Sequence, residues 1–117
     1  EKGGQWVKGK SGDTFGPLGP YLVTKDEIKD INNLNLSLEV NGKRHQTGNT
    51  SLMIFNFNYL ISHLSNFMTL MPGDIITTGT PPGVGLGMSP PKFLKNGDEM
   101  YLKVDNLGEQ KSKVITE

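Results

Sequence analysis

The chain has 117 residues, 34% of them hydrophobic, and its 12 Lys and Arg balance 12 Asp and Glu to a formal net charge of +0. One domain is the expected organisation at this length, and the even charge argues against binding to nucleic acid or to an anionic membrane. The sequence contains no cysteine, which excludes disulfides, thiolate metal sites and cysteine nucleophiles. The lack of cysteine fits an intracellular protein, and we expect a cytoplasmic location, with mitochondria as the alternative.

The first predicted element is an ordered loop. Residues 9–20 read GKSGDTFGPLGP, which contains too much Gly and Pro for a helix. The next element is a β-hairpin, because residues 34–40 alternate apolar and polar side chains and are followed by Asn41-Gly42. That dipeptide is typical of a two-residue hairpin turn, so the second strand is expected to begin at Lys43.

An amphipathic helix is predicted between Asn58 and Phe67, since apolar residues recur there at helical spacing and Asn56 or Asn58 can cap the first turn. The surrounding apolar stretch, residues 52–71, is interrupted by Asn, Ser and His, so it does not predict a membrane span.

Two further elements follow this helix. Pro72-Gly73 is suited to the centre of a type II turn, and residues 75–78 are predicted to form a strand that enters a second Gly/Pro loop, residues 79–91. A closing hairpin is predicted from residues 99–105 and 110–116, which alternate in polarity around Asn106-Leu107-Gly108.

Two glycine patterns suggest nucleotide binding, but neither has the required context. Residues 4–11 match the phosphate-loop pattern GxxxxGK[ST], yet no buried strand precedes them and no helix is predicted after them. Residues 83–88 end in Met88 instead of the last glycine of the dinucleotide fingerprint, and Pro90-Pro91 would block the following helix. We therefore expect nucleotide binding at neither segment, and residues 83–88 are predicted to form a loop.

Lys10 and Thr80 are the main candidate functional residues, because each lies in a Gly/Pro loop and not on a periodic solvated face. A lysine beside a divalent ion can stabilise an enolate oxygen or act as a base, whereas elsewhere it is simply a solvated cation. A threonine at a loop mouth can offer its hydroxyl and nearby backbone N–H groups to a carboxylate, or it can stabilise a turn.

Three other polar residues are more simply explained by structural roles. His63 fits the polar face of the predicted helix, and His45 fits a solvated position on a hairpin strand. Asp13 is a possible general base, but an aspartate in a Gly-rich loop more often caps backbone N–H groups.

Residues 5–20, QWVKGKSGDTFGPLGP, resemble the central segment of the fumarylacetoacetate hydrolase family. Four later segments resemble the family as well and occur in the family's order, so the similarity spans essentially the whole chain. They are VNG (40–42), QTGNTSLMIF (46–55), PGDII (72–76) and TGTPPGVG (78–85).

This resemblance implies an α+β, mainly β fold: a mixed β-roll with one or two short helices, usually in a homodimer. Residues 1–117 would form a single domain, the C-terminal part of the family's catalytic domain. The family also implies Mg²⁺ or Mn²⁺ held by a Glu-x-Glu pair and a later Asp, all expected upstream of this chain. We therefore assign no metal ligand within the present sequence.

The resemblance also implies the site residues. Lys10 matches the family's active-site lysine, and Thr80 with Gly79 matches the loop that contacts the substrate carboxylate; Gln5 is assigned to the substrate site too, and Trp6 beside it. The implied mechanism has the metal chelate a 2-oxo acid while Lys10 stabilises the developing enolate.

The expected reaction is acylpyruvate-type C–C hydrolysis, or the related decarboxylation, hydration or isomerisation of 2-oxo or 1,3-dicarbonyl acids. The alternative is a noncatalytic β-roll module that binds small carboxylates or a protein partner, because the metal ligands are absent from this sequence.

Overall fold

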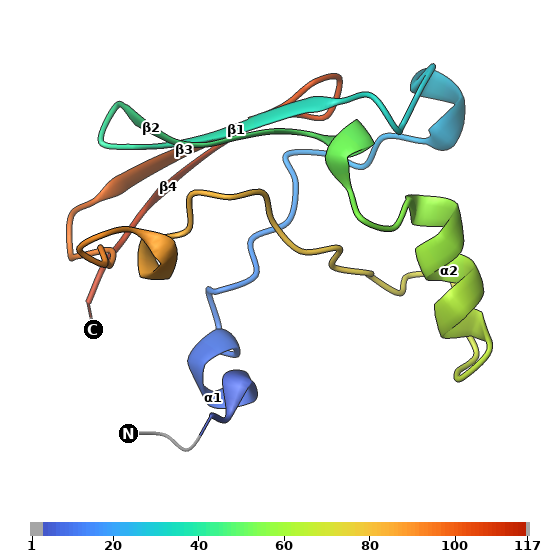
Figure 1. Ribbon diagram of the computed structural model, residues 1–117, viewed down its shortest axis with the longest axis horizontal. Coiled ribbons are helices and arrows are strands. Elements are labelled where there is room, and N and C mark those ends of the chain that lie inside the picture. Colours follow the sequence, from blue (N-terminus) through green and yellow to red (C-terminus); the bar gives the residue numbers. More distant parts are fainter. Residues whose placement is uncertain (1–3, 117) are drawn as a thin grey trace.

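A four-stranded antiparallel sheet dominates the computed structural model, which describes residues 4–116. Its strands follow the order β2-β1-β3-β4, so β2 and β4 are the two edges (Figure 1). The strand bounds are β1 Asn35–Val40, β2 Lys43–Asn49, β3 Glu99–Val104 and β4 Gly108–Lys113. The expectation of an α+β, mainly β fold is confirmed, as are both predicted hairpins.

The turn between β1 and β2 explains why the first hairpin was predictable. Asn41 and Gly42 both adopt positive φ, 51° and 73°, which the two-residue turn of a twisted hairpin requires. In β2, the register skips a residue: Leu38 pairs with Gln46 but Glu39 pairs with Arg44, which leaves His45 as the extra residue of a bulge.

Within residues 4–116, two α-helices and three short 3₁₀ turns lie outside the sheet (Figure 1). The predicted helix is confirmed as α2, and the Asn56 side chain caps it by accepting a 2.9 Å hydrogen bond from the Tyr59 N–H. The bounds of the helices are α1 Trp6–Lys10 and α2 Phe57–Ser65, and the 3₁₀ turns span Lys25–Glu27, Thr50–Leu52 and Gly85–Gly87.

Two expectations from the sequence are wrong. Residues 75–78 form no strand but run as extended chain beneath the sheet, because no strand of the described residues pairs with them (Figure 1). Gly9 and Lys10 do not begin the loop but end α1, and the loop starts at Ser11. The turn at Gly73 is confirmed, with φ of 97° and a 3.0 Å hydrogen bond from the Asp74 N–H to the Met71 carbonyl.

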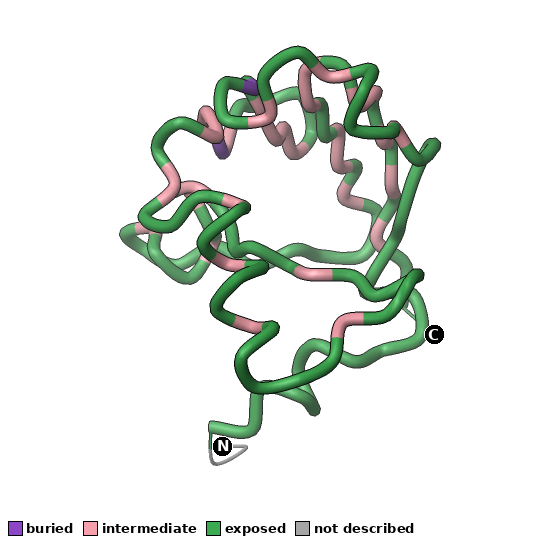
Figure 2. The backbone as a smooth tube through the Cα atoms, turned by 90° about the vertical axis from the view of Figure 1, so that its right-hand side faces the viewer, coloured by how far each residue is buried: buried purple, intermediate pink, exposed green. Residues whose placement is uncertain are grey.

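Very little of the described chain is buried. Within residues 4–116, only Leu34 and Gln46 are buried, and most residues are exposed (Figure 2). The accessible surface is 9888 Å², against about 6300 Å² for a compact monomer of this mass. The radius of gyration is 15.9 Å, against about 13 Å for a compact domain of this length.

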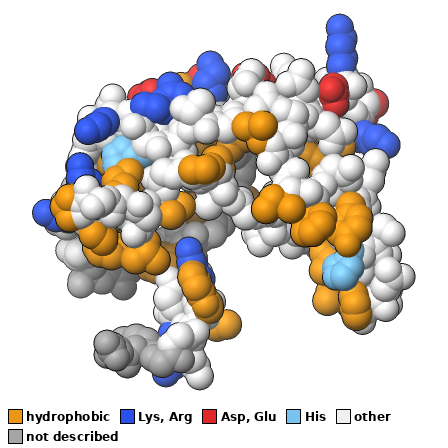
Figure 3. All heavy atoms as spheres, in the orientation of Figure 1, with side chains coloured by type: hydrophobic (Ala, Val, Ile, Leu, Met, Phe, Trp, Pro, Cys, Tyr) orange, Lys and Arg blue, Asp and Glu red, His pale blue; other side chains and the backbone are white. Residues whose placement is uncertain are grey.

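The exposed surface is apolar on one side. Hydrophobic side chains gather along the underside of the sheet and on α2, while charged side chains lie along the upper rim (Figure 3). On and beside α2, the rings of Phe55, Tyr59, His63 and Phe67 form a row with centroid separations of 4.7, 6.0 and 5.0 Å. An apolar surface this extensive is typical of one that another protein segment covers.

Within residues 4–116, no helix has the length and apolar character needed to cross a membrane.

Candidate functional site

The loop that carries Thr80 is anchored to the edge strand β2. The side-chain amide of Gln46, only 8% exposed, donates a 2.7 Å hydrogen bond to the Thr80 hydroxyl and a 2.6 Å hydrogen bond to the Pro81 carbonyl. Thr80 itself is exposed. A buried amide that satisfies two acceptors therefore fixes the position of the hydroxyl on an exposed residue.

Glycines allow this loop to approach the strand closely. A Cβ added at Gly83, which has a φ of +114°, would overlap the His45 carbonyl oxygen at the bulge of β2. A Cβ added at Gly48 would lie 2.8 Å from the Pro81 side chain. The bulge turns the His45 carbonyl toward the loop, and only glycine fits against it.

Gly79, which precedes Thr80, also has a positive φ of +91°, but a Cβ there would meet nothing within 4 Å. Its role in the loop is therefore conformational, and the open space beside it leaves the backbone accessible to a small ligand.

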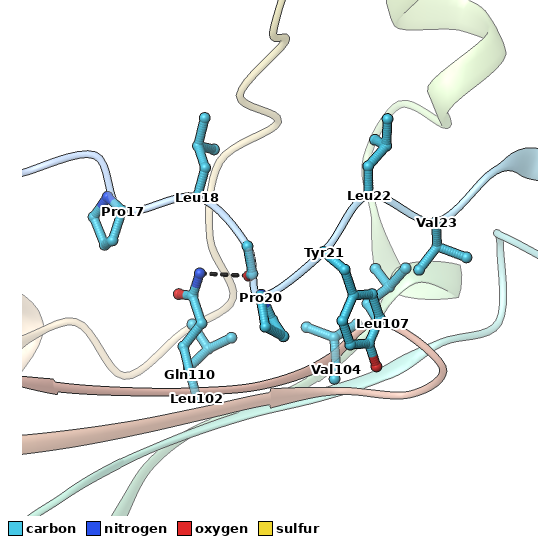
Figure 4. Close-up of a pocket in the computed structure, with 12 residues that line it drawn as sticks. Pro17, Leu18, Pro20, Tyr21, Leu22, Val23, Leu102, Val104, Leu107 and Gln110 are labelled. Atoms are coloured by element: carbon cyan, nitrogen blue, oxygen red, sulfur yellow. Dashed lines mark hydrogen bonds between the residues drawn. The ribbon is translucent and has the colours of Figure 1, made fainter.

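A second loop is anchored to the opposite edge strand, β4. The Gln110 side chain donates a 2.5 Å hydrogen bond to the Gly19 carbonyl, and Pro20 and Tyr21 lie over the strand (Figure 4). A Cβ added at Gly108 would lie 2.8 Å from the Tyr21 hydroxyl and 3.0 Å from Pro20, so this contact too needs glycine. A groove of about 330 Å³ remains between this loop and the sheet.

A larger groove, of about 550 Å³, lies beside the Thr80 loop. The bulge residue His45 and the buried Gln46 line it, and its walls are otherwise mainly apolar, with Leu38, Val40, Val84, Phe93, Leu94 and Met100. At its rim, hydrogen bonds from the Asn41 side chain and the Lys95 N–H hold the pKa of the Asp98 carboxyl below its ordinary value of 3.8.

The other predicted site residues lie apart from this loop. Lys10 is the exposed last residue of α1, and Gln5 precedes the helix without capping it through its side chain. Among residues 4–116, no hydrogen bond joins Lys10 or Gln5 to Gly79 or Thr80. The structure therefore brings Gly79 and Thr80 together but leaves Lys10 and Gln5 on a separate, exposed arm (Figure 1).

Trp6 shares this arm and is 73% exposed. Asp13 is exposed as well, and within the described chain the backbone N–H groups that donate to aspartate side chains reach other aspartates and not Asp13.

Metal binding depends on the donor atoms present. Within residues 4–116, no three His, Asp or Glu side chains cluster closely enough to hold a metal ion. The described residues therefore do not form the carboxylate site that Mg²⁺ or Mn²⁺ would need.

Gln46 and Gln110 are the residues that sequence reasoning missed. Each joins its strand to a loop distant in sequence, 34 residues away for Gln46 and 91 for Gln110. The available signal was a glutamine within each predicted strand, and for the buried Gln46 the amide must find a hydrogen-bond partner.

Comparison with known proteins places the chain among a group of enzymes. The family model described as "Fumarylacetoacetate (FAA) hydrolase C-terminal" matches residues 1–115. A Burkholderia ambifaria protein named "Putative hydrolase" is 60% identical over 111 residues, which are 94% of this chain and 39% of that protein.

Two solved structures share the fold. Fumarylacetoacetate hydrolase from Exiguobacterium antarcticum matches with a TM-score of 0.90 and 39% identity, over 94% of this chain and 39% of that one. Maleylpyruvate hydrolase from Sphingobium sp. SYK-6, solved with manganese(II) and pyruvate, matches with a TM-score of 0.80 and 39% identity, over 88% and 36%. The chain thus spans about two fifths of the length of these proteins.

Proposed function

Because this chain belongs to the fumarylacetoacetate hydrolase family, we propose that residues 1–117 form the C-terminal part of a catalytic domain in a longer enzyme. Its substrate would be a 2-oxo acid or a 1,3-dicarbonyl acid. The reaction we favour is acylpyruvate-type C–C hydrolysis, since one similar structure is that of a maleylpyruvate hydrolase with bound pyruvate. Decarboxylation, hydration and isomerisation of such acids are the competing reactions.

The observation that carries this proposal is the anchored Thr80 hydroxyl. Gln46 holds it at 2.7 Å, on a loop that Gly83 allows to rest against β2. A hydroxyl fixed before the ligand arrives loses little conformational entropy on binding, which favours recognition of a small carboxylate. We assign the substrate carboxylate to Thr80, with the backbone of Gly79 beside it.

Lys10 is proposed to act at the other end of the substrate, where negative charge develops on an enolate oxygen. Its exposed position at the end of α1 leaves the ammonium group available. We propose that the complete protein folds this arm against the Thr80 loop, so that both side chains reach one ligand. Gln5, in the turn before α1, would contact the same ligand.

The enzyme is also proposed to need a divalent metal, Mg²⁺ or Mn²⁺, because a similar structure contains manganese(II). Residues 4–116 do not supply a group of side chains that could hold a metal ion. The ligands would therefore come from the remainder of the longer protein, and this chain would contribute the carboxylate-binding loop and the lysine.

The large apolar surface suggests further contacts. We propose that the remainder of the longer protein covers part of it and that a second copy, in a homodimer, covers another part. Size-exclusion chromatography with light scattering on the longer protein tests the dimer, and a monomer at micromolar concentration would contradict it.

The direct test of the function is cleavage of acetylpyruvate, followed by loss of its enol absorbance in the presence of Mg²⁺ or Mn²⁺. We expect turnover by the longer protein and none by this chain alone. Turnover of other 2-oxo acids without acetylpyruvate cleavage would redirect the assignment to a decarboxylase, hydratase or isomerase. Pyruvate binding without any turnover would favour the noncatalytic module.

A further inference from the structure

Gln46 does more than anchor the loop, because its two hydrogen bonds fix which way its amide points. The same nitrogen, Nε2, approaches the Thr80 hydroxyl at 2.7 Å and the Pro81 carbonyl at 2.6 Å. A carbonyl oxygen can only accept, so the group facing Pro81 must be the NH₂ and not the amide oxygen. Reversing the amide would bring two carbonyl oxygens into repulsive contact.

This orientation decides whether the Thr80 hydroxyl donates or accepts the hydrogen bond with Gln46. Since the NH₂ group has no acceptor capacity, the hydroxyl oxygen must accept the hydrogen bond from Gln46. The hydroxyl proton then stays free, and no residue that the structure describes accepts a hydrogen bond from it. Because Thr80 is exposed, that proton is available to a ligand.

We infer that Gln46 is a positioning residue that orients the Thr80 hydroxyl to donate its proton in a hydrogen bond to the ligand, and thereby makes the site selective for an anionic oxygen. This inference rests on the proposed role of Thr80 in substrate binding. A donor aimed at a carboxylate makes a charge-assisted hydrogen bond, roughly twice as strong as a neutral one. A ligand that presents an N–H group at the same place would meet a second donor and be rejected.

Substitutions of Gln46 separate this role from simple loop anchoring. In Gln46→Glu the carboxylate accepts the hydroxyl proton, so Thr80 turns its lone pairs toward the ligand. In Gln46→Met the side chain has a similar length but leaves the hydroxyl free to rotate. In the longer protein we expect pyruvate binding, measured by calorimetry, to weaken about 2- to 10-fold in Gln46→Met and about 10- to 100-fold in Gln46→Glu.

Comparing a neutral ligand in Gln46→Met and Gln46→Glu separates a reversed hydroxyl from loss of anchoring. Pyruvamide has the size of pyruvate but lacks its charge, so the preference for pyruvate should shrink in Gln46→Glu. If the loop simply detached, the preference would shrink equally in Gln46→Met and Gln46→Glu, because both would lose the Thr80 donor. Gln110→Glu is the matched control, since it makes the same change in the glutamine that anchors the other loop. It should leave the preference unchanged.

Direct repulsion between the carboxylate introduced by Gln46→Glu and the ligand is tested by a double-mutant cycle with Thr80→Val. If the effect runs through the hydroxyl, Gln46→Glu should have little further effect on pyruvate binding when the Thr80→Val substitution is already present. An equal effect in both backgrounds would overturn the inference while leaving the proposed function intact.

Failure of the proposed function gives a different result. If the unsubstituted protein binds neither pyruvate nor acetylpyruvate, the side-chain NH₂ of Gln46 is examined by NMR. Two slowly exchanging protons, one of which becomes fast in Thr80→Val, would still support the fixed hydroxyl. Fast exchange of both protons in the unsubstituted protein would overturn it.

Discussion

Replacement of Gly83 by alanine should break the contact between the Thr80 loop and β2. The new Cβ would overlap the His45 carbonyl oxygen, and the φ of +114° disfavours any side chain. Positive φ costs about 1–2 kcal/mol. Displacing the loop also leaves the buried Gln46 amide without its two acceptors, at about 1–3 kcal/mol. The free energy of unfolding should fall by about 2–5 kcal/mol in total.

Gly73→Ala is the matched control. Gly73 has a similar φ of +97°, but a Cβ there meets nothing within 4 Å. It should therefore lose only the backbone contribution, about 1–2 kcal/mol. Urea-induced unfolding of the longer protein measures both variants, and limited proteolysis should show faster cleavage within residues 79–85 in Gly83→Ala alone. Equal losses of stability with unchanged proteolysis would refute the proposed docking against β2.

Three further predictions concern the lysine, an acidic turn and a helix cap. Lys10→Ala in the longer protein should lower kcat about 100-fold with little change in KM, because a charge-stabilising donor acts mainly in the transition state; an unchanged kcat would remove Lys10 from the mechanism. The Asp98 pKa lies below 3.8, so its carboxylate stabilises the fold above that pH, and this contribution is lost as the pH falls through the lower, folded-state pKa. Asp98→Asn should therefore be destabilising at pH 7 in urea unfolding but not near pH 2, and a loss of equal size at both would contradict this. Asn56→Ala removes the cap of α2 and should cost about 1 kcal/mol, while Asn58→Ala, within the helix, should cost less; thermal unfolding compares the two.

Local chemistry explains what could be predicted from the sequence. The first hairpin follows from Asn41-Gly42, since few residues adopt the positive φ values that its turn requires. The start of α2 follows from Asn56, whose cap is formed three residues along the chain. These features depend on contacts between near neighbours in sequence, and the structure confirms them.

Most of the errors came where contacts between residues distant in sequence decide the structure. Residues 75–78 have strand-like composition, but a strand needs a partner and the described chain places none beside them. The short helix α1 was missed because Gly9 and the following Gly/Pro segment indicate a loop, although one helical turn fits before Ser11. Gln46 was missed as a functional residue because its partners, Thr80 and Pro81, lie 34 and 35 residues away.

The candidate site was likewise predictable only in part. The family resemblance pointed to Thr80 and Gly79, and the structure places both on a loop held against β2. The approach of Lys10 to that loop stays a prediction, because the described residues make no hydrogen bond between the two.

The central claim is that the anchored Thr80 hydroxyl binds the carboxylate of a 2-oxo acid. Titration of the longer protein with pyruvate in the presence of Mn²⁺ tests it, comparing Thr80→Val, which removes the hydroxyl, with Thr80→Ser, which keeps it. Thr77→Val, an exposed threonine of the same segment, is the control. We predict that Thr80→Val weakens binding about 10- to 100-fold while Thr80→Ser and Thr77→Val stay near the unsubstituted protein. Equal affinity of Thr80→Val and Thr80→Ser would contradict the account.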